Sequence, residues 1–113
     1  MFTVRFACED VLVSLGEAAA PVLRELARGS PDPIAKRHGI RALGRMADPF
    51  SLFLLRELLA HEDWRVRYEA AGALGAFITK DPLSAPVARA ALADRAGTEE
   101  NPFVKSRLSA LLR

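Results

Sequence analysis

Residues 58–75 have the sequence Leu-Leu-Ala-His-Glu-Asp-Trp-Arg-Val-Arg-Tyr-Glu-Ala-Ala-Gly-Ala-Leu-Gly, and this stretch decides the fold. Asp63 stands directly before Trp64 and is suited to cap a helix, because its carboxylate accepts hydrogen bonds from unpaired N–H groups of the first turn. From Val66 onward, apolar residues recur at offsets of 4, 7, 8 and 11, the pattern of one helix face. The stretch therefore predicts a turn and then an amphipathic helix.

The same capping device occurs at four further positions, where Asp or Asn precedes proline. They are Asp32-Pro33, Asp48-Pro49, Asp81-Pro82 and Asn101-Pro102. With Asp63, these caps predict helices near residues 33–46, 49–60, 64–78, 82–95 and 102–112. Two earlier helices, near 3–15 and 18–28, are separated by Gly16, which we expect in the left-handed conformation that ends a helix. Pro21 and Pro86 fall in first helices of pairs, where a proline bends the helix or marks its true start.

Self-comparison shows an internal repeat of 31 to 32 residues. Leu23-Arg24-Glu25-Leu26 recurs as Leu55-Arg56-Glu57-Leu58, and Ala42-Leu43-Gly44 recurs as Ala73-Leu74-Gly75. Such periods are typical of helix pairs that stack and bury a continuous core. We therefore predict an all-α fold, a short right-handed α-solenoid of about three and a half helix pairs and roughly seven helices. Residues 1–113 form one domain in this interpretation, with a half repeat at 1–16 and repeats at 17–47, 48–80 and 81–113.

In this register the second helix of each pair turns an apolar stripe toward the core. The aligned rows are Val4, Ala35, Val66 and Val104; Cys8, Gly39, Ala70 and Leu108; Val11, Ala42, Ala73 and Leu111; and Leu12, Leu43, Leu74 and Leu112. Leu15, Met46 and Phe77 complete the stripe. We expect Leu74 to be buried and Glu69, on the same helix, to be exposed.

Residues 58–75 resemble the HEAT-like repeats of the phycobilisome-lyase type, which carry a short acidic turn, a Val-Arg pair, then Ala-Ala and Leu-Gly. The resemblance is best over residues 48–78, good over 17–47 and loose over 79–113. It implies the HEAT-like fold. Ser30, His61 and Glu99 stand where the family has an Asp, so we do not expect the family's Asp–Arg ladder between repeats in its usual form.

Composition leaves the kind of partner open. The 16 basic and 14 acidic residues give a net charge of +2, which neither requires nor excludes a polyanion. Cys8 is the only cysteine, so a reducing compartment is expected. The sequence has no secretory pattern and no apolar run that could span a bilayer, which predicts a cytoplasmic protein with no membrane contact.

Two sets of cations are candidate binding residues. Arg37, Arg41 and Arg45 share one stripe of a second helix, which lines the concave surface in HEAT-like stacks. In the repeat register Arg37 lies between Phe6 and Tyr68, and Arg41 lies between Asp10 and Gly72. This stripe can hold a carboxylate or a phosphate, or it can be a solvated face in which Arg41 pairs with Asp10.

The second set places one cation at the same position of every second helix. Its members are Arg5, Lys36, Arg67 and Lys105. This row can track a polyanion, or it can bind turn carbonyls and acids of adjacent repeats.

The sequence has no phosphate-binding glycine loop, nucleophile elbow or paired-carboxylate motif, and two histidines cannot build a di-iron site of the kind found in the HEAT-like deoxyhypusine hydroxylase. Trp64 and Cys8 are interpreted as packing residues. We therefore expect no enzyme activity, no catalytic or metal site and no cofactor.

The leading hypothesis is a protein–protein interaction scaffold that uses the concave second-helix face, with Arg37, Arg41, Arg45, Phe6, Tyr68 and Arg67, or the open ends of the solenoid. The alternatives are a nucleic-acid-binding module and an accessory subunit of an enzyme such as a chromophore lyase. The first helix has no pairing helix before it, and Phe2, Phe6 and Val13 lie on its uncovered flank. A homodimer through this N-terminal helix, or a partner protein in its place, is therefore expected.

Overall fold

The computed structural model describes residues 13 and 15–113, and this part of the chain contains six α-helices and no strand. The helices are α2 (Ala20–Gly29), α3 (Pro33–Met46), α4 (Leu52–Leu58), α5 (Trp64–Lys80), α6 (Ala85–Ala96) and α7 (Pro102–Leu111). Two 3₁₀ turns, η1 (Gly16–Ala18) and η2 (Pro49–Ser51), precede α2 and α4. The all-α prediction is confirmed, and the helix predicted over residues 3–15 lies almost wholly outside the described residues.

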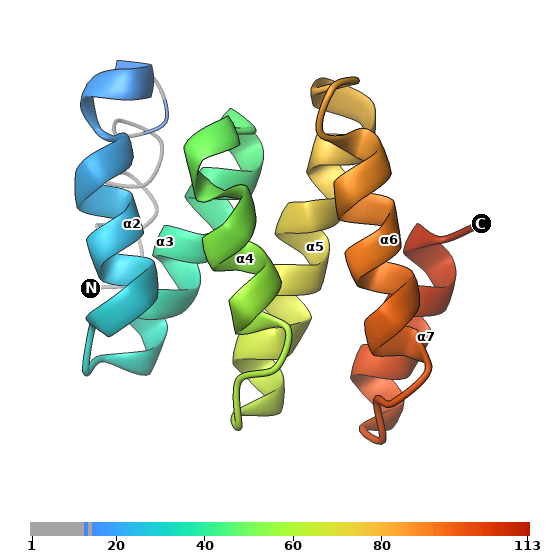
Figure 1. The fold of residues 1–113 in the computed structure, drawn as a ribbon. Helices are drawn as coiled ribbons and strands as arrows, with labels where there is room; N and C mark the ends of the chain where they lie inside the picture. The colour runs from blue at the N-terminus through green and yellow to red at the C-terminus, as the bar shows by residue number, and fades with distance from the viewer. Residues whose placement is uncertain (1–12, 14) are drawn as a thin grey trace.

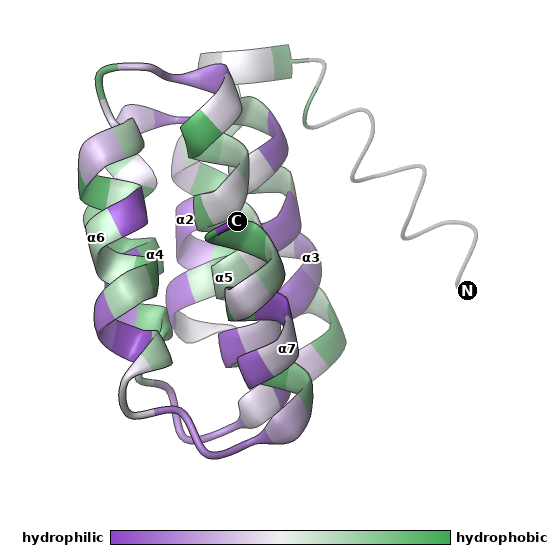
Figure 2. Cartoon of the chain, turned by 90° about the vertical axis from the view of Figure 1, so that its right-hand side faces the viewer, coloured by the Kyte–Doolittle hydropathy of each residue, from purple (hydrophilic) through white to green (hydrophobic). Residues whose placement is uncertain are grey.

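The helices stack as antiparallel pairs in two layers (Figure 1). Helices α2, α4 and α6 form the first-helix layer, and α3, α5 and α7 form the second-helix layer, as the view along the stack shows (Figure 2). Helix α5 lies at the centre and packs against α3, α4, α6 and α7. This arrangement is a short α-solenoid, in which each pair covers the apolar face of its neighbours.

Three of the five predicted caps are present. The side chains of Asp32 and Asp63 accept hydrogen bonds from the backbone N–H groups two residues later, at 3.0 and 2.9 Å. Asn101 Oδ1 accepts from the N–H groups of Phe103 and Val104, at 2.9 and 3.2 Å. These side chains fix where α3, α5 and α7 begin, and so where the second-helix layer places its residues.

The caps predicted at Asp48 and Asp81 are wrong, because both carboxylates bind other side chains. Asp48 is buried and accepts hydrogen bonds from Arg24 and Ser51, so a 3₁₀ turn follows it and α4 begins only at Leu52. A buried carboxylate is better compensated by a guanidinium than by a neutral donor. Asp81 accepts from Ser84 Oγ at 2.6 Å, and α6 begins after that turn, at Ala85.

The prolines and Gly16 behave as helix punctuation. Pro21 and Pro86 each occupy the second position of their helix, α2 and α6, so they mark true starts and not bends. Gly16 has φ +63°, which confirms the predicted left-handed conformation.

The core runs along the stack through residues that the repeat register aligns. The largest fully buried apolar side chains are Leu23, Ile40, Leu43, Leu55, Val66, Leu74, Phe77, Leu92, Val104 and Leu108. The predicted burial of Leu74 is confirmed. Leu15 was expected on the inward stripe and is instead 57 % exposed, while Val4, Cys8, Val11 and Leu12 lie outside the described residues.

Helices α3 and α5 approach each other especially closely. A Cβ added at Gly44 would lie 2.6 Å from the Cα of Ala73, so only glycine fits there. This contact holds α3 and α5, neighbours in the second-helix layer, close together.

Candidate partner-binding face

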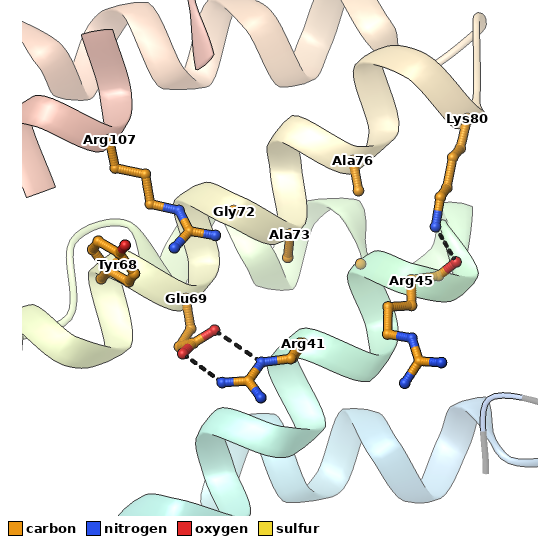
Figure 3. Close-up of a pocket in the computed structure, with 10 residues that line it drawn as sticks. Arg41, Arg45, Tyr68, Glu69, Gly72, Ala73, Ala76, Lys80 and Arg107 are labelled. Atoms are coloured by element: carbon orange, nitrogen blue, oxygen red, sulfur yellow. Dashed lines mark hydrogen bonds and ion pairs between the residues drawn. The ribbon is translucent and has the colours of Figure 1, made fainter. Parts of the chain in front are cut away.

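The solvent side of α3, α5 and α7, here called the second-helix face, holds two adjoining hollows. The first of them, the basic hollow, is shown in Figure 3. Its volume is about 280 Å³. It is lined by Arg41, Gly44, Arg45, Tyr68, Glu69, Gly72, Ala73, Ala76, Lys80 and Arg107. Four of these side chains are cationic and one is a carboxylate, so the hollow is suited to an anionic group.

The carboxylate of Glu69 organises the arginines of α3. Arg41 Nη2 lies 2.9 Å from Glu69 Oε1, and Arg37 Nη2 lies 3.7 Å from the same oxygen (Figure 3 shows the Arg41 pair). Glu69 is only 7 % exposed, so the predicted exposure of this residue is wrong. A buried carboxylate requires such partners because removing it from water is costly. The partner predicted for Arg41, Asp10, lies outside the described residues.

Arg107 of α7 crosses the groove onto α5. Its guanidinium carbon lies 4.1 Å from the centre of the Tyr68 ring, a cation–π contact visible in Figure 3. A Cβ at Gly72 would lie 1.8 Å from Arg107 Nη2, so the guanidinium occupies the space that the absent side chain leaves. The sequence interpretation missed Arg107; the only clue to it was Gly72 in a helix interior, which indicates a close approach.

Lys80 closes the other end of the basic hollow. Its Nζ donates a hydrogen bond of 2.8 Å to the backbone carbonyl of Arg45, in the last turn of α3 (Figure 3). A cation at this helix end satisfies an unpaired carbonyl and interacts favourably with the helix dipole.

The aromatic hollow, of about 310 Å³, is lined by Arg37, Trp64, Arg65, Tyr68 and Phe103. Trp64 and Phe103 stack with ring centres 5.4 Å apart, and Trp64 meets Tyr68 edge to face at 6.4 Å. Arg65 lies over the Trp64 ring at 5.4 Å. Tyr68 borders both hollows, so the aromatic surface and the basic surface are continuous.

Arg37 is incompletely paired, because one of its guanidinium nitrogens is buried without a hydrogen bond to any described residue. Its Nε is buried and has no hydrogen-bond partner among the described residues, and its one ion pair, with Glu69, is 3.7 Å long. Arg37 and Tyr68, which the repeat register places side by side, both line the aromatic hollow. Phe6, the other expected neighbour, lies outside the described residues, as does Phe2.

Arg67 lies between repeats, away from both hollows. Its Nε and Nη2 donate to the two carboxylate oxygens of Glu99 at 2.8 and 3.0 Å, and its Nη1 donates to the carbonyls of His61 and Glu62. Glu99 therefore pairs with Arg67 between repeats, at the position where the HEAT-like repeats that this sequence resembles have an Asp. The sequence did not lead us to expect this contact. We leave Arg67 out of the binding face because these contacts occupy its guanidinium.

Glu99 is a buried carboxylate with three donors. Burial raises its pKa, but the hydrogen bonds from Arg67, the backbone N–H of Asn101 and Arg95 outweigh burial and lower the pKa to about 2. Glu99 therefore stays ionised at neutral pH and ties α5, α6 and the start of α7 together.

Lys36 has the same structural role as Arg67. It is 8 % exposed, burial lowers its pKa, and its Nζ donates to the carbonyl of Arg28 at 2.9 Å. Lys36 and Arg67 belong to the predicted row of one cation per second helix. For these two residues, the alternative in which the cations bind turn carbonyls and acids of the chain is confirmed. Arg5 lies outside the described residues.

Neither a metal cluster nor a membrane span occurs in the part of the chain that the structure describes. Within residues 13 and 15–113 no three His, Cys, Asp or Glu side chains come together in a way that could bind a metal ion. No helix in those residues is long and apolar enough to cross a bilayer.

The family model for HEAT repeats matches residues 20–113, which include all six described helices. No curated protein and no solved structure shows significant similarity to the chain.

Proposed function

This chain belongs to the HEAT repeat family, and on that basis we propose that it is a scaffold that binds a partner protein through its second-helix face. HEAT repeats commonly mediate protein–protein interaction, because stacked helix pairs form an extended surface on which a partner can bind. The observation that supports this face is the pair of adjoining hollows built by three successive second helices. That this scaffold has no enzyme activity is part of the proposal.

Three features make the face suited to binding. Phe103 is 63 % exposed although it is a large apolar residue, and aromatic residues are enriched where binding energy is concentrated. Arginines surround it, and arginine is similarly enriched at such positions. The basic hollow is lined in part by residues with small side chains or none, Gly44, Ala73 and Ala76, and the Arg107 guanidinium lies over Gly72.

Nucleic-acid binding is the second candidate, supported by the excess of cations around the basic hollow. Against it, Lys36 and Arg67 are engaged with the chain itself, and Glu69 offsets part of the positive charge of Arg37 and Arg41. The phycobilisome-lyase subtype, an accessory role beside a chromophore lyase and a cytoplasmic location rest on the sequence and stay predictions. The division into repeats at 17–47, 48–80 and 81–113 is likewise a proposal.

The proposed function is tested by affinity purification with two matched double variants. Phe103→Ala/Arg45→Ala alters the second-helix face, and Phe53→Ala/Arg56→Ala alters α4 of the first-helix layer. The pairs are matched because Phe103 is 63 % and Phe53 65 % exposed, and both arginines are exposed. We expect a protein captured by the wild-type chain and by the α4 variant to be lost from the second-helix variant. Loss from the α4 variant alone contradicts the proposal.

A further inference from the structure

We infer that the segment bound on the second-helix face is an acidic peptide segment of a partner protein that inserts one large apolar side chain into the aromatic hollow. This inference rests on the proposed function and specifies the chemistry of its partner. It follows from the shape of the groove, the charge around it and the incomplete pairing of Arg37.

The two hollows form one groove along α5. Its floor is a stripe of residues four apart, which begins with aromatic side chains, continues with small ones and ends at a cation. The Arg107 guanidinium lies over Tyr68 and Gly72 in the middle of this stripe. The stripe consists of Trp64, Tyr68, Gly72, Ala76 and Lys80. Arg37, Arg41 and Arg45 of α3 form one wall, and Phe103 and Arg107 of α7 form the other.

The length of this groove suits a short extended segment. From Trp64 to Lys80 the helix rises about 24 Å. An extended chain covers that distance with about seven residues. The groove therefore suits a linear segment of a partner better than a whole domain surface.

Charge complementarity identifies the segment as acidic. Among the residues that line the two hollows, six are cationic and Glu69 is the one carboxylate, whereas the whole chain has 16 basic and 14 acidic residues. The positive charge is thus concentrated on this face. Complementary charge on the partner speeds association and selects against basic segments.

The aromatic hollow identifies an apolar anchor. Its volume of about 310 Å³ leaves room for one large side chain. Trp64, Tyr68 and Phe103 supply apolar walls, while Arg37 and Arg65 on the rim disfavour a cationic ligand. An anchor such as Phe or Leu next to acidic residues matches this combination.

Arg37 is the residue that we assign to the carboxylate beside the anchor. Its side chain is 35 % exposed, its Nε is buried without a partner among the described residues, and its Nη2 reaches Glu69 only at 3.7 Å. A guanidinium in this state can accept a second carboxylate in a two-pronged contact, which lysine cannot reproduce.

A peptide fits this face better than a nucleic acid. A nucleic acid carries a phosphate on every nucleotide, so it needs a regular row of cations along its path. A peptide can place its acidic residues beside the arginines and leave neutral residues opposite Glu69. In the row of one cation per second helix that could follow a phosphate backbone, Lys36 and Arg67 already bind groups of the chain itself.

Trp64 is the only tryptophan of the chain and lines the aromatic hollow, so its fluorescence reports on the anchor directly. The intact chain is titrated with synthetic nine-residue peptides that contain one Phe, five Glu or Asp and no Trp or Tyr, with the Phe at either end. We expect saturable change in Trp64 emission with at least one orientation. Affinity should fall at least tenfold when the peptide's Phe becomes Ala or its acids become amides.

Matched variants and a nucleic-acid probe complete the test. Arg37→Gln and Phe103→Ala should each weaken binding of the acidic peptide at least fivefold, whereas Phe53→Ala should leave it unchanged, with circular dichroism confirming that each variant is folded. A single-stranded oligonucleotide of equal charge should bind more weakly than the peptide. Tighter binding of the oligonucleotide overturns the inference, as does equal affinity for the peptide in which Ala replaces Phe.

Failure of this inference is distinguishable from failure of the proposed function. If neither peptide orientation changes Trp64 emission at millimolar peptide concentration, the inference of an acidic segment is wrong. If the captured partner is nevertheless lost from the Phe103→Ala/Arg45→Ala variant, the proposed scaffold function stands. If capture does not depend on that double variant, the proposed function fails as well.

Discussion

At the scale of single residues, three buried carboxylates help to fix how the helices pack. The pattern of charges in the sequence does not predict their burial. Glu69, Asp48 and Glu99 are all buried, and each is paired with arginine from another helix. An isolated buried charge is costly, so each pair holds two helices in one relative position. The sequence could not show these pairs, because they join residues 24 to 32 positions apart through long side chains that can turn in several directions.

Glu99 gives the chain a defined sensitivity to acid. Its folded-state pKa of about 2 is below the ordinary 4.5, so the unfolded chain binds a proton first as the pH falls. The stabilisation is complete above pH 4.5 and is lost as the pH falls toward 2, an effect of about 3 kcal/mol. Glu99→Gln should lower stability at pH 7 and flatten this part of the pH profile. The check is urea unfolding followed by circular dichroism at several pH values.

Glu57→Gln is the control for this pH dependence, because Glu57 is exposed on α4. It should leave the profile unchanged. If Glu99→Gln and wild type lose stability in parallel between pH 4.5 and 2, the role assigned to Glu99 is wrong.

At the scale of helices, the close approach of α3 and α5 determines how the second-helix face is built. Gly44→Ala places a methyl group 2.6 Å from the Cα of Ala73, where backbone must move. Overpacking of this kind costs about 1–3 kcal/mol, more than the gain of about 1 kcal/mol when Ala replaces Gly in a helix. We therefore expect Gly44→Ala to destabilise the chain in thermal or urea unfolding.

Gly72→Ala is the matched comparison in the neighbouring helix. Its methyl group meets only the end of the flexible Arg107 side chain, which can move away at little cost. It should leave stability within about 1 kcal/mol of wild type, because the gain in helix propensity offsets the lost contact with Tyr68. Equal destabilisation by both substitutions would show that the α3–α5 contact is not as described.

The core register makes a further prediction for α5. Leu74 is fully buried, so Leu74→Ala should lower the free energy of unfolding by about 2–5 kcal/mol. Glu57→Ala, at an exposed position of α4, should change it by less than about 0.5 kcal/mol. Similar melting temperatures for the two variants would mean that the register is wrong.

At the scale of the whole molecule, local sequence patterns predicted the helices, and the repeat period predicted how they stack. Asp32, Asp63 and Asn101 cap helices as expected because capping needs only neighbours in sequence. The binding face was predicted only in part. Arg37 and Tyr68 could be placed together by the repeat period, whereas the contact of Arg107 on α7 with Tyr68 on α5 depends on the spacing of these two helices.

Self-association is a separate prediction at this scale. Leu15 is 57 % exposed, Val13 is half-buried against the core, and Phe2 and Phe6 precede the described residues. Apolar surface left in water costs about 25 cal/mol per Å², so we expect a homodimer through the helix that the sequence predicts at residues 3–15. Phe2→Glu/Phe6→Glu should convert dimer to monomer in light scattering with helical content unchanged. A wild-type chain that stays monomeric at high concentration refutes the dimer.

The central claim, that a partner protein covers the second-helix face, is tested most directly by oxidative footprinting of the chain with its captured partner. Phe103 and Phe53 are almost equally exposed, at 63 % and 65 %, and belong to opposite layers of the stack. The partner should protect Phe103 from oxidation and leave Phe53 as reactive as in the free chain. Protection of Phe53 with Phe103 unchanged would contradict the claim.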